Sequence, residues 1–288
     1  MKNEICYIFI MKNNYCYFDG KILPIEKARI YPDDLGILRG YGIFDVVKTC
    51  NNKIFLFDEH WKRINNSAKS YGLKVLLEKS ELEKIIEKLI IKNKIKNATI
   101  RIVLTAGRSA DAMHFDPFSP TFYVLVSELK LLPDDYYEKG VKLKLVNYAR
   151  NTPEIKSLNY SVAVRVINES QGKEKFYEVL YAQDGKIYEA ATSNFFIFKG
   201  NILITPNDNI LKGTIRNLVI KLAGKNFKVE ERELMAKELQ SADEAFITAT
   251  NKDIVPVVKI EDFSIGNGRV GDNTRFLMRK LREYIENY

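Results

Sequence analysis

Lys156 is the residue of this chain whose setting best suits chemistry. It lies between a strand-like run, Val141 to Tyr148, and a predicted helix that begins near Tyr160. Removal of a lysine from water lowers the pKa of its ammonium group and yields a nucleophilic amine. Because most lysines are simply exposed, Lys156 alone also fits a solvated loop, and a chemical role needs support from other segments.

Two further charged residues are suited to hold a flat, anionic ligand. Glu189 ends a predicted strand, and the small residues from Ala190 to Ser193 leave room beside its carboxylate. Arg63 lies one turn after His60 on a predicted helix, outside the apolar stripe of that helix. Since glutamates and arginines are mostly exposed, each of these residues also fits a solvent-facing position when it is considered by itself.

A predicted helix start offers a site for a phosphate group. Gly213 precedes a segment in which Ile215, Leu218 and Leu222 follow helical spacing. The free backbone N–H groups of Thr214 and Ile215, together with the positive end of the helix dipole, are suited to bind an anion. A glycine before a helix is common, so this feature gains weight only in combination with others.

Two arginines have sequence settings that require an anion. Arg39 belongs to a turn in which Gly40 and Gly42 flank Tyr41, and Arg101 lies among apolar residues of a predicted strand. A buried, unpaired arginine costs on the order of several kcal/mol, so Arg101 must bind an anion or face solvent. Two alternatives stay open: Arg101 pairs with a carboxylate of the protein, and Arg39 only braces its loop.

The composition is that of an ordinary globular protein. The 288 residues carry a net charge of +8, but the lysines are spread along amphipathic segments such as Lys79 to Lys96, which argues against nucleic-acid binding. The three cysteines lack C-x-x-C spacing and there are only two histidines, so we expect no metal site and no disulfide framework. The apolar run from Ile5 to Ile10 is too short for a signal peptide. A cytoplasmic protein without membrane association fits best.

The predicted elements that position these residues fall into two series. The first begins with a strand from Tyr15 to Phe18 and includes a helix opened by a capping box at Ser80-x-x-Glu83. The second begins at Val141, after a segment around Pro133 that has the composition of a linker. We therefore predict domains over residues 1–128 and 141–288 with an interdomain linker at 129–140, and we expect residues 1–10 to be an extension.

The chain resembles a known enzyme family through motifs that share the order and spacing of that family. The motifs are Arg39-Gly40-Tyr41-Gly42-Ile43-Phe44-Asp45, His60-Trp61-Lys62-Arg63, Lys156-Ser157-Leu158-Asn159, Glu189-Ala190-Ala191-Thr192-Ser193-Asn194, Leu211-Lys212-Gly213-Thr214-Ile215-Arg216 and Thr248-Ala249-Thr250. They are similar to those of the fold-type IV pyridoxal-phosphate aminotransferases, from about Tyr15 to the C-terminus. The resemblance implies an α+β fold with a small α/β domain, residues 1–128, and a larger, pseudo-barrel β-rich domain that binds the cofactor, residues 141–288.

The same resemblance assigns the cofactor, pyridoxal 5'-phosphate, and the residues around it. Lys156 is implied to form the Schiff base and to move a proton between the substrate and the cofactor. Glu189 would face the pyridine nitrogen and favour its protonated form, and Arg63 would offer a bidentate clamp to the phosphate. The other implied cofactor contacts are Ser193, Asn194, Thr214, Ile215 and Thr250.

The activity implied by the family is transfer of an amino group between an amino acid and a 2-oxo acid, in a homodimer with shared active sites. The segment Lys156-Ser157-Leu158-Asn159 is closer to D-amino-acid transaminases, which favours substrates such as D-glutamate and D-alanine. We expect Arg101 of the same subunit and Arg39 of the neighbouring one to clamp the substrate's carboxylates. The predicted substrate contacts are Arg39, Tyr41, Arg101, Thr250 and Asn251. The alternatives are a branched-chain L-amino-acid aminotransferase, a 4-amino-4-deoxychorismate lyase and a non-enzymatic basic binding protein.

Overall fold

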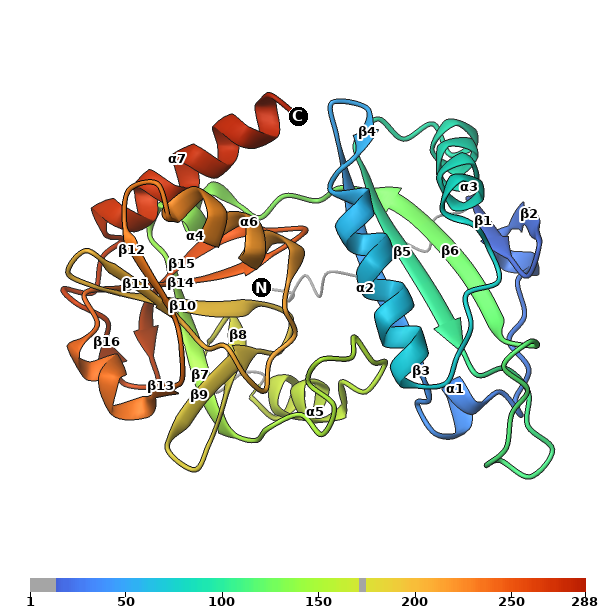
Figure 1. The fold of residues 1–288 in the computed structure, drawn as a ribbon, viewed down its shortest axis with the longest axis horizontal. Coiled ribbons are helices and arrows are strands. Elements are labelled where there is room, and N and C mark those ends of the chain that lie inside the picture. The colour runs from blue at the N-terminus through green and yellow to red at the C-terminus, as the bar shows by residue number, and fades with distance from the viewer. Residues whose placement is uncertain (1–13, 171–174) are drawn as a thin grey trace, which may run out of the picture.

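The first half of the chain forms an antiparallel six-stranded sheet with two long helices packed against it (Figure 1). The computed structural model describes residues 14–170 and 175–288, so the predicted extension at 1–10 lies outside the described residues. The strands, in spatial order, are β2 (Lys21–Pro24), β1 (Tyr15–Phe18), β6 (Thr121–Glu128), β5 (Ala98–Thr105), β3 (Gly42–Cys50) and β4 (Lys53–Ile54). The helices are η1 (Ile25–Lys27), α1 (Leu35–Leu38), α2 (Phe57–Ser70) and α3 (Lys79–Lys92).

Apolar side chains at helical spacing fix α2 and α3 on this sheet. Ile64 of α2 and Ile86 of α3 share one buried core with Val47 of β3 and Ile100 of β5. Because apolar residues recur every three or four positions on both helices, one face of each is buried against the strands. The sheet and its helices therefore form a stable support for the residues at the end of β3.

The second half forms a curled sheet of ten strands with helices on it (Figure 1). In spatial order the strands are β12 (Lys228–Glu231), β11 (Ile202–Thr205), β10 (Asn194–Lys199), β14 (Glu244–Ala249), β15 (Asp253–Ile260), β7 (Val141–Asn147), β8 (Glu178–Gln183), β9 (Lys186–Ala190) and β13 (Leu234–Met235), with β16 (Phe263–Ser264) paired to β15. The helices are α4 (Asp134–Glu138), α5 (Ser161–Glu169), α6 (Thr214–Ala223), η2 (Ala236–Ser241) and α7 (Asp272–Glu286).

Both faces of the curled sheet are buried, as β10 shows. Alternate residues of a strand point to opposite faces, and here Phe195 and Ile197 belong to one core whereas Phe196 and Phe198 belong to another. The second core is covered by α6 and α7 through residues such as Leu218. A central strand that is buried on both faces has a continuous apolar run, which is the pattern from Phe195 to Phe198.

The α+β architecture predicted from the sequence is observed, with two local differences. The capping box of α3 uses Glu78 and Glu81, and the Glu78 N–H donates to the Glu81 carboxylate over 2.9 Å. The box predicted at Ser80 is therefore wrong, because the helix begins at Lys79 and Ser80 lies inside its first turn. In addition, α4 lies within the predicted linker at 129–140. The division into domains at that segment stays a prediction.

Backbone hydrogen bonds join the start of β3 directly to the loop that carries Lys156. The Phe44 N–H donates to the Lys156 carbonyl over 2.9 Å, and the Leu158 N–H donates to the Gly42 carbonyl over 3.0 Å. A Cβ atom at Gly42 would lie 2.7 Å from Cδ1 of Leu158 and 2.8 Å from the Leu104 carbonyl. A glycine at position 42 is therefore required for this close approach, which fixes the loop that carries Lys156.

Candidate active site

A cavity of about 560 Å³ lies between the two sheets and contains most of the predicted site residues. Its lining combines residues from β3, α2 and β5 with residues from β9, β10, α6 and the end of β14. Six cationic side chains line it, together with a single carboxylate, that of Glu189. The cationic residues are Arg63, Arg101, Arg150, Lys156, Arg216 and Lys252. This excess of positive charge suits an anionic ligand.

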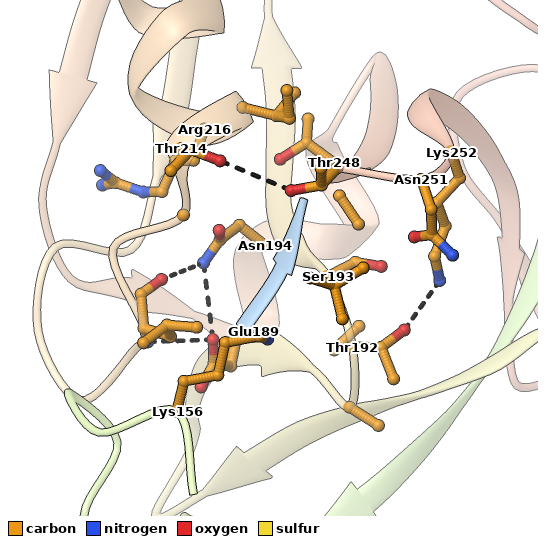
Figure 2. A pocket seen from close by; sticks show the side chains of 18 of the residues that line it. Lys156, Glu189, Thr192, Ser193, Asn194, Thr214, Arg216, Thr248, Asn251 and Lys252 are labelled. Atoms are coloured by element: carbon orange, nitrogen blue, oxygen red, sulfur yellow. Dashed lines mark hydrogen bonds between the residues drawn. The ribbon is translucent and has the colours of Figure 1, made fainter. Parts of the chain in front are cut away.

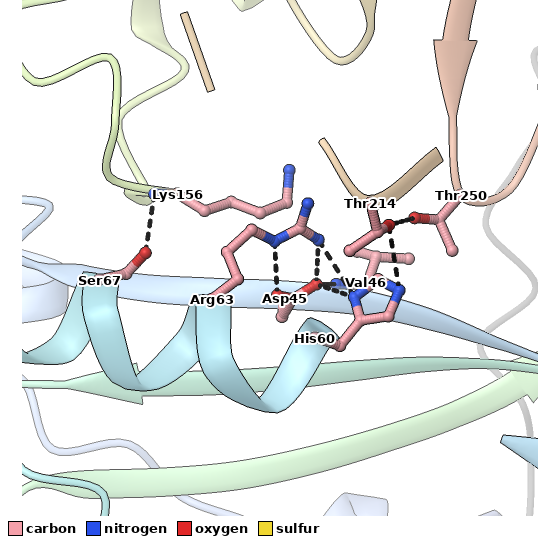
Figure 3. A network of polar contacts seen from close by, with 8 residues as sticks. All are labelled: Asp45, Val46, His60, Arg63, Ser67, Lys156, Thr214 and Thr250. Carbon is pink, nitrogen blue, oxygen red and sulfur yellow. Dashed lines mark hydrogen bonds and ion pairs between the residues drawn. The ribbon is translucent and has the colours of Figure 1, made fainter. Parts of the chain in front are cut away.

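Lys156 lies on the loop before α5, and its ammonium group faces the cavity (Figures 2 and 3). The ammonium nitrogen lies 4.7 Å from the centre of the Phe44 ring. Burial, reinforced by the positive charge of Arg63, lowers the pKa of Lys156 to about 7. A large fraction of this amine is therefore neutral, and hence nucleophilic, near neutral pH.

Glu189 lies on β9 and is buried at 5% exposure, rather than facing solvent from an edge strand. Its carboxylate accepts hydrogen bonds from the Leu211 N–H over 3.0 Å and from Nδ2 of Asn194 over 3.5 Å (Figure 2). Burial raises the pKa of Glu189 to about 7, although the neighbouring Arg150 opposes the shift. A cationic ligand group beside it would favour the ionised carboxylate.

Arg150 links Glu189 to the lysine loop and was not predicted from the sequence. Its guanidinium pairs with Glu189 over 2.9 Å and also donates to the carbonyls of Pro153 and Ile155. The available signal was its place three residues after the end of β7, at the entry to the loop that carries Lys156. Arg150 thus sets the relative positions of the amine and the carboxylate.

Arg63 is held by a buried carboxylate that the sequence analysis did not single out (Figure 3). Its Nε and Nη2 atoms donate to Asp45 over 2.9 and 2.5 Å. Burial alone would raise the pKa of Asp45, but the neighbouring Arg63 and His60 hold this pKa well below its usual range. The bidentate clamp predicted for a phosphate is therefore occupied on one edge by Asp45, and only the Nη1 side of the guanidinium remains for a ligand.

Gly213 is the N-cap of α6, the helix start at which the sequence predicts an anion site. A Cβ atom at Gly213 would lie 2.2 Å from Oδ1 of Asn194, so this close packing requires glycine. Thr214 and Ile215 line the cavity directly after it, and Oγ1 of Thr214 lies 3.5 Å from Oγ1 of Thr250. These groups are brought together as predicted.

Two buried polar atoms that line the same cavity lack a hydrogen-bond partner among the described residues. They are Oγ1 of Thr248 and Nε of Arg216. An unpaired buried donor costs about 1–3 kcal/mol, and a bound anion would satisfy such donors. Together with the helix start and the surplus of cations, they fit a ligand that carries a phosphate group.

The other predicted cofactor contacts also lie in this cavity. Ser193 is buried and donates to Oε2 of Glu178 over 2.9 Å. The amide of Asn194 donates to the Leu211 carbonyl over 2.6 Å. Lys252, which was not predicted, donates to Thr192 over 2.8 Å (Figure 2) and to Glu178 over 2.8 Å. Glu178 at the start of β8 and Lys252 after β14 therefore both hold Thr192 in the segment after β9.

Among the arginines that line the cavity, Arg101 is the one that forms no hydrogen bond or ion pair with the described residues. Its side chain is exposed on β5, its Cζ atom lies 5.3 Å from the centre of the Phe44 ring, and no described carboxylate pairs with it. The described residues therefore give no support to the alternative in which Arg101 pairs with a carboxylate of the protein. Tyr160, another unpredicted lining residue, packs its ring against Phe44 at 5.6 Å.

The structure does not bring Arg39 and Tyr41 to the cavity of their own chain. Arg39 is exposed, and its guanidinium donates to the Leu38 carbonyl over 2.9 Å. Tyr41 stacks on Tyr71 with ring centres 4.7 Å apart and donates its hydroxyl to the Tyr71 carbonyl. Asn251, by contrast, lines the cavity next to Thr250.

A partly buried, weakly basic lysine and a buried carboxylate beside a phosphate-type helix start fit a site for an aldehyde cofactor. The comparisons agree, since residues 42–260 match the family described as amino-transferase class IV. This chain belongs to the class IV aminotransferases, as its motifs predicted. Enzymes of this family use pyridoxal 5'-phosphate, which confirms the predicted cofactor.

Individual relatives cover nearly the whole chain. A Methanocaldococcus jannaschii protein, provisionally named a branched-chain-amino-acid aminotransferase, is 32% identical over 280 residues, which span 93% of this chain and 95% of that protein. A D-alanine aminotransferase of Staphylococcus aureus is 28% identical over 278 residues, 94% of this chain and 98% of the relative. The crystal structure of Escherichia coli branched-chain amino acid aminotransferase superimposes with a TM-score of 0.88 at 25% identity and covers 96% and 95% of the two chains. These likenesses confirm the fold class.

Two further observations concern the described residues alone. They contain no helix that is long and apolar enough to cross a membrane. Within the same part of the chain, no group of three or more histidine, cysteine, aspartate or glutamate residues is placed to hold a metal ion.

Proposed function

We propose that this aminotransferase moves an amino group between a D-amino acid, such as D-glutamate or D-alanine, and a 2-oxo acid, with Lys156 as the catalytic residue. The observation that carries the assignment of Lys156 is its approach to the same cavity as Glu189, with both pKa values near 7. General acid–base groups work best when their pKa lies near the working pH. Lys156 is therefore suited both to bind an aldehyde and to carry a proton.

The other site residues would hold the cofactor in a fixed position. When it is bound, pyridoxal phosphate withdraws electrons from the α-carbon of the amino acid. Glu189 would face the ring nitrogen, where its negative charge favours a protonated ring. The backbone amides of Thr214 and Ile215 and the Nη1 side of Arg63 would bind the phosphate. Ser193, Asn194 and Thr250 would complete the wall of the cavity.

Arg101 would bind a carboxylate of the substrate. It is an arginine without a carboxylate partner among the described residues, in a cavity whose other charged groups are mostly paired. An exposed guanidinium at the wall of a substrate cavity is suited to a bidentate contact with a carboxylate. The sequence Lys156-Ser157-Leu158-Asn159 and the Staphylococcus relative named D-alanine aminotransferase support D-amino acids as the substrates.

A branched-chain L-amino-acid aminotransferase is the second candidate. Phe44, Val46 and Leu158 line the cavity and would provide an apolar wall for a branched side chain. The Methanocaldococcus and Escherichia proteins carry this activity in their names. The lyase activity has less support, because none of the named relatives is a lyase.

Steady-state assays with paired D- and L-amino acids distinguish the D-amino-acid activity from the branched-chain L-amino-acid activity. Each enantiomer of glutamate, alanine, leucine and valine would be tested with 2-oxoglutarate and with pyruvate as acceptors. We expect kcat/KM for D-glutamate or D-alanine to exceed that of the L-enantiomers. Turnover restricted to L-leucine and L-valine would select the branched-chain activity and overturn the proposed D-preference.

We further propose a homodimer in which Arg39 and Tyr41 belong to the neighbouring active site. The segment that carries them exposes Tyr31, Ile37 and Leu38 at 57%, 62% and 38%. Exposed apolar groups of this kind are typical of a protein interface. Because Arg39 does not line the cavity of its own chain, it would contact substrate in the active site of a second copy of the chain.

Mixing two defective variants tests this arrangement. In a mixed dimer of Lys156→Ala and Arg39→Ala, one site would have an intact Lys156 from one chain and an intact Arg39 from the other. Random reassortment should then restore about one quarter of the wild-type sites, since about half of symmetric dimers become mixed. Arg39→Ala mixed with wild-type protein serves as the control for reassortment. No gain above the separately measured variants would show that Arg39 does not act across the dimer.

A further inference from the structure

A buried hydrogen-bonded chain runs from Asp45 to the start of α6 (Figure 3). Nδ1 of His60 lies 2.9 Å from Oδ1 of Asp45, and Nε2 of His60 lies 3.3 Å from Oγ1 of Thr214. The Thr214 hydroxyl in turn lies 3.5 Å from that of Thr250. His60 is 1% exposed and does not itself line the cavity. A hydrogen-bonded route from His60 to a ligand in the cavity therefore passes through Thr214.

The positions of the protons on His60 follow from its partners. Nδ1 of His60 lies 2.9 Å from Oδ1 of Asp45 and 3.2 Å from Nη2 of Arg63. An ionised carboxylate only accepts hydrogen bonds, and the contact with Asp45 is the shorter of the two, so we assign a proton to Nδ1. In the neutral ring Nε2 is then a bare acceptor, and the Thr214 hydroxyl must donate to it. In this state the Thr214 proton points to His60 and cannot bond to an anion in the cavity.

We propose that His60 is a proton-coupled positioning residue for the phosphate-binding end of the cavity. When a phosphate dianion binds there, His60 takes one proton from solvent at Nε2 and donates it as a hydrogen bond to Oγ1 of Thr214. The Thr214 hydroxyl then turns and donates to the phosphate. This inference rests on the proposed function, which places the phosphate group at Thr214 and Ile215.

The charged groups around His60 explain why binding of an anion would favour protonation of the ring. Asp45 faces it from β3, Arg63 from its own helix α2 and Lys156 from the loop before α5, whereas α6 and the end of β14 present the uncharged Thr214 and Thr250. Burial lowers the pKa of His60, Asp45 opposes this effect, and Arg63 and Lys156 lower the pKa further. A dianion would offset the two cations and raise the pKa of the ring.

Histidine NMR tests the proposal on the unmodified protein. The chain has two histidines, and the second, His114, is exposed and pairs with Asp111 over 2.6 Å. Imidazole ¹⁵N shifts report which ring nitrogen carries a proton. At about pH 7.5 we expect Nε2 of His60 to be unprotonated in the cofactor-free protein and protonated after addition of pyridoxal 5'-phosphate. Pyridoxal, which lacks the phosphate, should leave the state of His60 unchanged.

Two results of the NMR experiment would overturn the proposal. One is a His60 ring that stays neutral when pyridoxal 5'-phosphate is bound, and the other is a ring that is already protonated in the cofactor-free protein. The His114→Gln variant assigns the two signals and should leave those of His60 unchanged.

The pH dependence of cofactor affinity gives an independent test. Between the His60 pKa values of the free and bound proteins, uptake of one proton lowers affinity about tenfold per pH unit as pH rises. The phosphate, Lys156 and Glu189 also titrate, so the relevant quantity is the ratio of wild-type affinity to that of His60→Gln. We expect this ratio to fall by up to about tenfold per pH unit across that interval, and the ratio of wild type to His114→Gln to stay constant.

Thr214 variants test the route through the hydroxyl. Thr214→Ser keeps the hydroxyl and should retain the His60 signal change, whereas Thr214→Val should abolish it while leaving the backbone amides in place. A signal change that persists in Thr214→Val would overturn the route. Absence of any binding of pyridoxal 5'-phosphate to the wild-type protein would overturn the proposed function as well, whereas binding without proton uptake by His60 would overturn this inference alone.

Discussion

The arginines at the two ends of the cavity differ in whether a protein carboxylate pairs with them. At the end proposed for the cofactor, Arg63 and Arg150 are each paired with a buried carboxylate, from Asp45 and Glu189 respectively. At the end proposed for the substrate, Arg101 is exposed and has no described carboxylate partner. Paired cations are fixed in orientation before a ligand arrives, whereas an unpaired cation gains its partner only on binding. The difference suggests a rigid site for a resident group and an open site for one that exchanges.

Lys156→Ala should have the largest effect, because Lys156 lies where the two ends meet. It removes both the amine and the proton carrier, so we expect kcat/KM to fall by more than about a thousandfold, since positioned proton transfer alone contributes 10²–10⁴. Single-turnover assays with the preferred amino acid measure the loss. Lys175→Ala, at an exposed lysine, is a matched control that should behave as wild type. A Lys156→Ala enzyme with more than a tenth of the wild-type rate would contradict the role of Lys156.

Glu189→Gln tests the cofactor end without removing its shape. The amide keeps the size and much of the hydrogen bonding of the side chain but loses the negative charge opposite the proposed ring nitrogen. We expect cofactor to remain bound while kcat falls by about a hundredfold or more, in line with losses of single electrostatic contacts in active sites. Absorbance titration gives cofactor affinity, and kinetics give kcat. Turnover near that of wild type would show that the charge of Glu189 is unnecessary.

Arg101→Ala tests the substrate end. Loss of a charge-assisted contact of about 1.5–3 kcal/mol should lower kcat/KM for the amino acid about ten- to a hundredfold. Cofactor affinity should not change, because no cofactor contact is proposed for Arg101. Arg279→Ala, at an exposed arginine of α7, is the matched control. If Arg101→Ala weakens cofactor binding and substrate use equally, the separation of the two ends is wrong.

The smallest expected effect concerns the stability of the cofactor-free protein. Burial lowers the pKa of Lys156 from 10.5 to about 7, so between these pH values the unfolded chain binds more protons at this residue than the folded one. Stability therefore rises with pH through this window, and the cost of the buried ammonium is full below about pH 7.

Lys156→Met removes that cost while it keeps an unbranched side chain that is only one atom shorter. The variant should be more stable than wild type at about pH 7, with a Tm higher by a few degrees, since about 1 kcal/mol shifts Tm by about 2–4 °C in large domains. Thermal unfolding of both cofactor-free proteins from about pH 7 to 9.5 should show the difference shrinking as pH rises. A constant difference would mean that the charge of Lys156 is not its cause.

The sequence predicted the strands and the main site residues because both leave local signals. Alternating apolar residues and turn pairs such as Asp184-Gly185 identify the hairpin of β8 and β9. Lys156, Glu189 and Thr214 were predicted to share a site from motifs that lie far apart in the chain, and the structure places all three around one cavity.

The roles of Asp45, His60 and Arg150 could not be predicted in the same way. Asp45 and His60 are joined only because α2 folds back onto β3, and Arg150 meets Glu189 only when β7 and β9 come together in the sheet. Such pairings depend on tertiary packing, which overrides local signals in the sequence. The clamp predicted for Arg63 was too simple for the same reason, since Asp45 occupies one edge of its guanidinium.

Chemical trapping of the cofactor tests the central claim most directly. Borohydride reduction of the enzyme loaded with pyridoxal 5'-phosphate would fix the cofactor to the amine that holds it, and peptide mass spectrometry would identify that residue. Two lysines line the cavity, Lys156 and Lys252, and the second is committed to Glu178 and Thr192. We predict that the phosphopyridoxyl group is found on Lys156 alone. Modification of Lys252 instead, or of no lysine in the cavity, would contradict the assignment of Lys156 as the catalytic residue.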